Sequence, residues 1–184
     1  MSENNKVNYG PLTGLIGVWQ GNKGKDVAPD PDDVEINNYY ETITFTEASE
    51  VTNAEFQVLS AVHYIQKVQR IDDDKVIHHE TGYWMWNQDS NEVMHSLVIP
   101  RGISVLAGGT VNEIDCIKLN VQASIENKDW KLIQSPFMNA KAKLTSYSQQ
   151  IVLTETSLYY TQTMMVDIYG KKVEHTDHNT LLRK

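Results

Sequence analysis

The sequence contains a single cysteine, Cys116, and no long run of apolar residues. One cysteine excludes an internal disulfide and any zinc site built from several cysteines. No stretch approaches the roughly 20 consecutive apolar residues that a membrane-spanning helix needs. The first six residues, MSENNK, also lack the apolar segment of a secretory signal. We therefore expect a soluble, cytoplasmic protein without a membrane partner.

Basic residues are outnumbered as well. Sixteen Lys and Arg stand against twenty-four Asp and Glu, which gives a net charge of −8. This excess of negative charge leaves no basic face to follow a phosphate backbone, so we do not expect nucleic acid as a partner. With 184 residues the chain is long enough for one well-buried core but short for two. We expect a flexible N-terminal arm over residues 1–11 and a single domain over residues 12–184.

The apolar residues alternate with a period of two along most of the chain. Val, Ile, Thr, Tyr and Trp are frequent in these segments, as is typical of β-strands. The segments expected to be strands are 36–46, 56–68, 75–87, 92–99, 103–107, 114–125, 141–148, 150–156, 158–169 and 171–183. Leu12, Leu15 and Ile16 instead have helical spacing over about one turn, which Gly17 ends. The stretch 127–140 interrupts the alternation, and we expect an irregular loop there.

Short turn sequences such as Asp72–Asp74 and Pro100–Gly102 separate the predicted strands. About ten short strands leave two architectures, a sandwich and a closed barrel. Hairpin-length connections favour the barrel, because a meander closes on itself without long crossovers. The sequence thus predicts an all-β protein, a roughly ten-stranded antiparallel up-and-down β-barrel with a short N-terminal helix or 3₁₀ turn. Barrels of this size often hold a small apolar ligand.

Aromatic residues are the first candidates for contact with such a ligand. Trp84 and Trp86 are two apart on one face of a predicted strand, and Tyr64 occupies another predicted strand. Two interpretations stay open. The tryptophans pack in the core, as large aromatic residues usually do, or they form a flat wall for a planar ligand. We take Trp84, Trp86 and Tyr64 as candidate pocket residues.

The histidines are the second group of candidates. His63 and His95 are isolated in strand patterns, where a hydrogen-bonded structural histidine is the favoured interpretation. Near the end of the chain, His175 and Asp177 share one face of a predicted strand, while His178 is on the other face. No two histidines there have the spacing of a conventional zinc site. A single histidine aimed into a barrel is nevertheless sufficient to bind the iron of a five-coordinate haem.

Several short motifs resemble one known family. The segment GVWQGNKG (17–24) is similar to its Gly-x-Trp-x-Gly-x-Gly opening, and HETGYW (79–84) to its Glu-(Thr/Ser)-Gly strand. A Pro-x-Gly turn at Pro100–Gly102 and the closing LRK (182–184) match as well. The chain thus resembles the nitrobindin-like family of ten-stranded barrels over residues 12–184. This resemblance implies haem b, bound through one histidine of the last strand. It also implies an activity toward nitric oxide or peroxynitrite, as in a peroxynitrite isomerase.

The same resemblance leaves two histidines as alternative axial ligands. Counting back from the closing basic pair, the family's iron-binding position falls on Asp177, next to His178. A β-bulge at Thr176–Asp177 turns His178 inward, and we favour this alternative because His178 is nearer to the family position. Without a bulge His175 faces the ligand. Insertions at Asp26–Ile36 and 127–140 are placed to cover or fill the pocket.

Two other functions remain open from the sequence. In the first, the barrel is a non-enzymatic carrier or sensor of another small apolar ligand and holds no haem. In the second, side chains fill the interior and the outer face binds a protein. A planar or apolar small molecule is the partner we expect, and the protein itself is a monomer or a homodimer.

Overall fold

The computed structural model describes residues 7–112 and 116–184, and most of its regular structure is β-strand. The strands are β1 (Gly17–Pro29), β2 (Val34–Asn53), β3 (Gln57–Arg70), β4 (Val76–Asn87), β5 (Glu92–Ile99), β6 (Ile103–Asn112), β7 (Ile117–Ser124), β8 (Lys131–Gln134), β9 (Ala142–Leu153), β10 (Ser157–Ile168) and β11 (Lys171–Arg183). Two short helical elements accompany them, the 3₁₀ helix η1 (Gly10–Leu15) and the α-helix α1 (Pro136–Lys141). The predicted all-β class and N-terminal 3₁₀ turn are confirmed.

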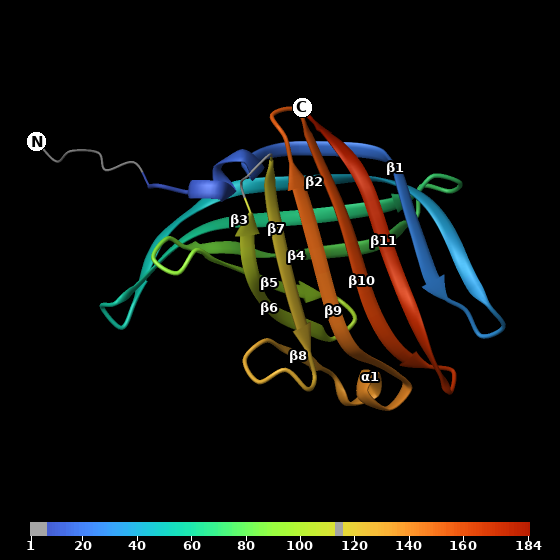
Figure 1. Cartoon of the computed structure of the whole chain (residues 1–184). Coiled ribbons are helices and arrows are strands. Elements are labelled where there is room, and N and C mark those ends of the chain that lie inside the picture. Colours follow the sequence, from blue (N-terminus) through green and yellow to red (C-terminus); the bar gives the residue numbers. More distant parts are fainter. Residues whose placement is uncertain (1–6, 113–115) are drawn as a thin grey trace, which may run out of the picture.

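Within the described residues, ten of the eleven strands close into an antiparallel barrel (Figure 1). Strands β1 to β7 pair in chain order, β9 pairs with β7, and β11 returns to pair with β1. Strand β8 extends the edge of β7, because β6 pairs with β8 at Ile103–Leu106 and with β7 at Gly108–Asn112. Figure 1 shows β9–β11 crossing β2–β4 at a steep angle. The ring leaves few unpaired edges, and the predicted up-and-down barrel is confirmed.

Three local predictions were wrong. Residues 141–156 were expected as two strands, yet β9 is continuous to Leu153, because Gln149 pairs with Gln162 on β10 and with Val121 on β7. Its buried side chain accepts a hydrogen bond from Tyr147 Oη at 3.0 Å. Strand β1 was not expected, since its glycines and lysines hide the alternation; pairing with β2 and β11 forms it nonetheless. The stretch 127–140 contains β8 and α1, which Ser135 caps by accepting a hydrogen bond from the Met138 amide at 3.3 Å.

The expected N-terminal arm, residues 1–11, lies only partly within the described residues, because 1–6 fall outside them. In the described part, Tyr9 is 6% exposed and belongs to the hydrophobic core, and Pro11 is buried as well. Packing against the barrel therefore begins before residue 12.

The 3₁₀ helix η1 closes one end of the barrel. Leu15 and Trp19 are fully buried there, and Trp19 Nε1 donates a hydrogen bond to the Leu15 carbonyl at 2.7 Å. The Arg183 guanidinium lies 4.4 Å from the centre of the Trp19 ring and donates to the Ile16 carbonyl at 2.6 Å. The first and last motifs of the sequence thus meet, and together they hold η1 in place as a plug.

The turns at the other end of the barrel surround an opening. The β1–β2, β3–β4, β5–β6 and β10–β11 connections lie there, together with α1. Strand β1 changes register between Gly21 and Gly24. A Cβ atom at Gly24 would collide with the Tyr39 ring, so this motif glycine leaves the space in which the tyrosine turns inward.

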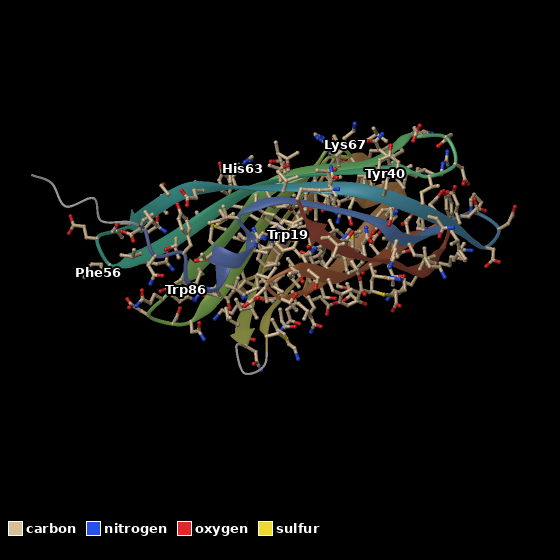
Figure 2. All side chains as sticks on the ribbon, turned by 90° about the horizontal axis from the view of Figure 1, so that it is seen from above. Trp19, Tyr40, Phe56, His63, Lys67 and Trp86 are labelled. Carbon is tan, nitrogen blue, oxygen red and sulfur yellow. The ribbon has the colours of Figure 1, made fainter. Side chains whose placement is uncertain are left out.

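The barrel exterior carries polar and scattered apolar side chains. Figure 2 shows His63 and Lys67 pointing away from the barrel, whereas Trp19 lies inside it. Phe56, at the tip of the β2–β3 hairpin, is 87% exposed. Among the described residues, no helix has the length and apolar character needed to cross a bilayer.

Candidate functional site

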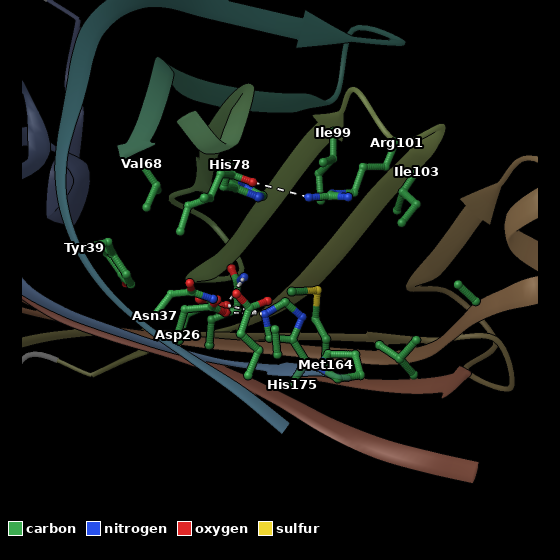
Figure 3. A pocket seen from close by; sticks show the side chains of 18 of the residues that line it. Asp26, Asn37, Tyr39, Val68, His78, Ile99, Arg101, Ile103, Met164 and His175 are labelled. Atoms are coloured by element: carbon green, nitrogen blue, oxygen red, sulfur yellow. Dashed lines mark hydrogen bonds and ion pairs between the residues drawn. The ribbon is translucent and has the colours of Figure 1, made fainter. Parts of the chain in front are cut away.

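A cavity of about 520 Å³ extends inward from the open end of the barrel (Figure 3). Its walls combine apolar side chains, among them Val68, Ile99, Ile103, Leu144, Met164 and Val166, with polar and charged ones. The polar lining comprises Asp26, Glu35, Asn37, Tyr39, Gln66, Arg70, Lys75, His78, Arg101, Tyr160, Gln162, Tyr169, His175 and Asp177. The two predicted insertions contribute Asp26, Ala28, Pro29, Glu35 and Met138, so they line the cavity without filling it.

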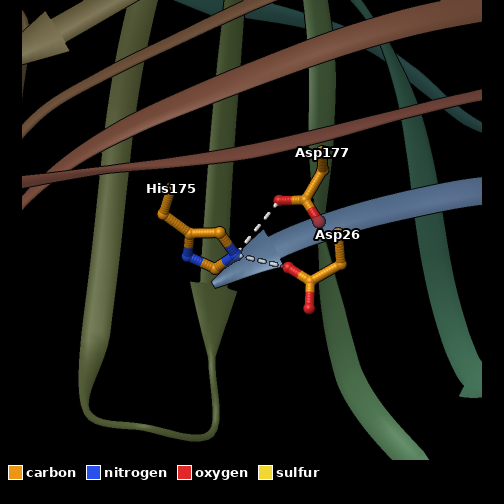
Figure 4. A group of neighbouring side chains, drawn as sticks. All are labelled: Asp26, His175 and Asp177. Atoms are coloured by element: carbon orange, nitrogen blue, oxygen red, sulfur yellow. Dashed lines mark hydrogen bonds and ion pairs between the residues drawn. The ribbon is translucent and has the colours of Figure 1, made fainter. Parts of the chain in front are cut away.

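His175 projects into this cavity from β11, between two carboxylates. Its Nε2 atom lies 2.7 Å from Asp26 Oδ1 and 3.6 Å from Asp177 Oδ2 (Figure 4). Burial alone would lower the pKa of His175, but the hydrogen bond to Asp26 and the negative charges of Asp177 and Asp26 together outweigh burial and raise the pKa above its usual range. The imidazole is therefore stabilised in its protonated form.

The two carboxylates beside His175 have shifted pKa values of opposite direction. Burial would raise the pKa of Asp26, yet the hydrogen bond and positive charge of His175, together with the hydrogen bonds with Asn37 and Asp177, outweigh burial and lower it. Burial raises the pKa of Asp177 to about 7, although the positive charge of His175 opposes the shift. Asp26 is therefore the ionised partner of His175, while Asp177 holds a proton up to about neutral pH.

A buried hydrogen-bond network lies deeper in the barrel, around Glu41. The hydroxyls of Tyr39 and Tyr160 are 2.7 Å apart, and Tyr160 donates to Glu41 Oε2 at 3.2 Å. Gln66 donates to the same oxygen at 2.6 Å, and Asn179 donates to Oε1 at 2.7 Å. Burial raises the pKa of Glu41 to about 7, even though these donors favour the carboxylate.

A second network begins at His78, on the wall of the cavity that β4 supplies (Figure 3). His78 Nε2 lies 2.9 Å from Glu80 Oε2, and Tyr64 Oη donates to Glu80 Oε1 at 2.5 Å. Because that bond uses the only hydroxyl proton of Tyr64, His95 Nε2 must donate to Tyr64 Oη, at 2.8 Å. Tyr147 continues the chain at 3.2 Å from His95 Nδ1. Polar contacts thus run from the cavity into the core.

The pKa shifts along this second network indicate which of its groups are charged and which are neutral. Burial would lower the pKa of His78, but the hydrogen bond to Glu80 and the negative charges of Glu80 and Asp177 together outweigh burial, and the net pKa is raised. Burial would raise the pKa of Glu80, but the hydrogen bond and positive charge of His78 and the hydrogen bond from Tyr64 are among the interactions that together outweigh burial, and the net pKa is lowered. Burial also lowers the pKa of His95 to about 4. An ion pair of His78 and Glu80 thus faces the cavity, with a neutral His95 behind it.

The structure separates the two candidate axial ligands of the last strand. His175 lines the cavity, and His178 is not among its lining residues. The pairing of β11 with β10 runs without a register shift from Leu182 to Lys171, so the bulge that would turn His178 inward is absent from this ladder. Alternation along the strand therefore directs His175 and Asp177 into the cavity and His178 away from it.

The aromatic candidates lie outside the cavity. Tyr64, Trp84 and Trp86 are at most 8% exposed and belong to the core, and none of the three is a lining residue. Trp84 stacks on His95 with ring centres 4.1 Å apart, and the Trp86 Nε1 group donates to Asn91 at 3.1 Å. Their placement matches the interpretation as core packing. His63 and His95 are hydrogen-bonded, as expected of structural histidines.

Asp26 and Arg101 are cavity residues that the sequence analysis did not select. Asp26 was assigned to an insertion, but it lies on β1 opposite Asp177 on β11. Alternation of Gly24, Asp26 and Ala28 would have identified its inward direction if residues 17–29 had been read as a strand. Asp26 and His175 are 149 positions apart in the sequence, and no sequence pattern indicates that they meet, because their contact depends on barrel closure.

Comparisons with known proteins agree with this architecture. The family model described as "THAP4-like, heme-binding beta-barrel domain" matches residues 8–183. Among solved structures, Rv2717c from M. tuberculosis resembles the chain with a TM-score of 0.70 and 22% sequence identity, over 94% of each chain. At that identity the likeness concerns the fold alone. No curated protein matches the sequence.

Proposed function

Because this chain belongs to the family of THAP4-like, heme-binding β-barrel domains, we propose that its cavity binds haem b and that the bound haem reacts with nitric oxide or peroxynitrite. The observation that carries this proposal is His175, a single histidine of the last strand that lines the cavity. An imidazole in such a position is a sufficient protein ligand for haem iron. We also propose a cytoplasmic location, consistent with a single cysteine.

The remaining residues of the cavity fit the other parts of haem. Ile99, Leu144 and Met164 offer apolar surface to a flat ring. Lys75 and Arg101, both exposed at the opening, offer positive charge to the two carboxylates of the ring. The cavity thus combines an iron ligand, an apolar wall and a basic rim.

Asp26 sets the condition under which His175 binds iron. A metal takes the unprotonated nitrogen, and His175 Nε2 is hydrogen-bonded to Asp26 at 2.7 Å. Binding therefore requires the imidazole to lose a proton and leave this carboxylate, and a charge-assisted hydrogen bond of this kind is worth about 1.5–3 kcal/mol. We expect weaker haem binding than an unpaired histidine would give.

His78 has a separate role in the proposal. It faces the cavity from β4, while His175 faces it from β11 (Figure 3). The Glu80 carboxylate, 2.9 Å from His78 Nε2, holds the imidazole in place and stabilises its positive charge. When bound, haem supplies the iron chemistry, and a cationic His78 stabilises an anion such as peroxynitrite beside it.

Hemin titration tests the proposal. Purified protein is titrated with hemin while the Soret band is recorded, and a shifted band that saturates at one hemin per chain is expected. In the His175→Ala variant the band should be lost or moved to the position of free hemin. His178→Ala is the matched control on the same strand, and we expect it to bind hemin like the parent.

Each outcome has a consequence. A protein that leaves the hemin spectrum unchanged would contradict haem binding and favour the haem-free carrier. Equal binding by the parent and His175→Ala would remove His175 from the proposal. For the reaction, stopped-flow decay of peroxynitrite should be faster with the loaded protein than with equimolar free hemin, and slower again in His78→Ala.

A further inference from the structure

Three side chains with metal-binding atoms meet in one corner of the cavity. Asp26, His175 and Asp177 each offer one ligand atom, and these atoms all lie within 4.8 Å of one another (Figure 4). Asp26 on β1 is the direct cross-strand partner of Asp177 on β11, and His175 is two residues away on the same face. The backbone pairing of two central strands therefore brings the three groups together, so their proximity does not depend on a mobile loop.

Neighbouring amides orient the two carboxylates. Along one row of the sheet, Gln162, Asp177, Asp26 and Asn37 are successive cross-strand partners on β10, β11, β1 and β2. Asn37 Nδ2 donates to Asp26 Oδ2 at 3.0 Å, and Gln162 Nε2 lies 3.5 Å from Asp177 Oδ2. Side chains that hydrogen-bond to the metal ligands and hold them in position are typical of protein metal sites.

Among the residues that the structure describes, no lysine or arginine competes with a metal ion for the ligand atoms of this corner. Two carboxylates face one imidazole, and in the described part of the chain His175 is their only ion-pair partner. The guanidinium of Arg70, although it lines the same cavity, pairs with Glu35 and Asp73 instead. A divalent ion that displaces the protons of His175 and Asp177 would therefore meet three ligand atoms that no described lysine or arginine holds.

We propose that Asp26, His175 and Asp177 bind a divalent first-row transition-metal ion, such as Zn²⁺ or Mn²⁺, when the cavity holds no haem. Two carboxylate oxygens and one imidazole nitrogen suit such an ion, whereas Mg²⁺ and Ca²⁺ prefer oxygen ligands alone. Ligand–metal distances near 2.1 Å require only small movements from the separations observed. The side of the ion facing the cavity stays open to water or a small anion.

This site goes beyond haem binding and does not depend on it. Both occupants use His175, so the divalent ion and haem exclude each other. Asp177 distinguishes them, because it is a ligand of the divalent ion and has no part in the proposed contact with haem iron. A variant at Asp177 therefore separates the two proposals.

The first test is direct metal binding. Full-length protein, freed of haem and treated with a chelator, is titrated with ZnCl₂ and with MnCl₂ by isothermal titration calorimetry. One ion per chain is expected, and Asp177→Asn should weaken binding at least about tenfold. Glu174→Gln is the matched control, since Glu174 is exposed on the same strand, and it should bind like the parent. Far-UV circular dichroism checks that each variant folds, and Asp26→Asn replaces Asp177→Asn if the latter does not.

Absence of binding by the parent would overturn the proposal. Equal binding by the parent, Asp177→Asn and His175→Ala would overturn it too, because the ion would then sit elsewhere.

The second test is competition. Excess Zn²⁺ should raise the hemin Kd of the parent at least about tenfold and leave that of Asp177→Asn nearly unchanged, as linkage through a shared site requires. If Zn²⁺ binds without changing the hemin Kd, mutual exclusion is contradicted. If hemin does not bind at all, haem binding fails while the calorimetry still decides the metal site.

Discussion

The two ends of the barrel are built from the same strands, but the side chains that face the interior differ between them. On β11 the inward residues pass from His175 and Asp177 at the open end to Leu181 at the closed end. On β2 they pass from Asn37 to Phe45. The closed end is an apolar core stabilised by burial, whereas the open end places charges around a cavity.

The difference shows how one barrel combines stability with a binding site. At the closed end, burial of Leu12 and Leu15 of η1 and of Trp19 on β1 stabilises the fold through the hydrophobic effect. Between the ends, Glu41 and Glu80 are buried with all their hydrogen-bonding oxygens paired. In the described residues no buried side-chain polar atom lacks a partner. The charged cavity is therefore accommodated by complete hydrogen bonding around it.

The largest expected effect concerns a matched pair of leucines. Leu15, fully buried in the plug, and Leu144, on the cavity wall, are each changed to alanine. Leu15→Ala should lower the free energy of unfolding by about 3–5 kcal/mol, and Leu144→Ala by about 2 kcal/mol, because Leu144 already adjoins empty space. Urea unfolding followed by tryptophan fluorescence measures both. Equal losses would contradict the division into a packed end and a binding end.

The second prediction concerns pH and Glu41. Its pKa is raised by burial to about 7 in the folded protein, against 4.5 ordinarily. Between these values the unfolded chain has lost the proton and the folded chain keeps it. Stability therefore falls as pH rises through this window, by about 1.4 kcal/mol per pH unit and roughly 3 kcal/mol in all. Below the lower pKa the contribution is fully present.

Glu41→Gln isolates this contribution, because the amide does not ionise. Unfolding free energies of parent and variant are measured by urea denaturation from pH 4 to 8, and their difference is compared. Asp177, whose pKa is also raised, is present in both proteins and cancels. A difference that does not change with pH would show that Glu41 keeps an ordinary pKa.

The smallest effect on stability is expected at the rim. Arg101 is exposed and donates to the Ile77 carbonyl at 3.3 Å. Arg101→Ala should change the free energy of unfolding by less than about 0.5 kcal/mol. The hemin Kd should nevertheless rise severalfold, because the variant removes positive charge from the opening. Thermal unfolding and hemin titration measure the two effects. A large loss of stability without a change in the hemin Kd would show that Arg101 stabilises the fold and does not contribute to hemin binding.

Much of the fold follows from local sequence pattern. Alternation in residues 75–87 and 92–99 predicts β4 and β5 almost to the residue, because adjacent strands with one buried face must alternate. The same rule missed β1, whose glycines are needed for a register shift and for the approach of Tyr39. Strand pairing there overrides weak local preference.

The candidate site was predictable only in part. Parity along the last strand places His175 and Asp177 on one face, and the structure agrees. The bulge that favoured His178 is a tertiary feature, and its absence from the pairing with β10 follows from twelve unshifted pairs that alternation alone does not reveal. For Trp84 and Trp86 the sequence left core packing and a ligand wall as alternatives, and the structure places both residues in the filled core.

The sequence by itself determined most of the strands, their turns, the barrel class and the shared face of His175 and Asp177, because each depends on side-chain alternation and turn residues close together in the chain. That this face, and not the face of His178, points into the cavity was decided by the unshifted pairing of β11 with β10. Only the tertiary structure decided which end of the barrel stays hollow and that Asp26 meets His175 and Asp177. These outcomes depend on closure of β1 against β11, which joins residues 149 positions apart. No local pattern encodes such a contact, since it arises when the first and last strands complete the ring.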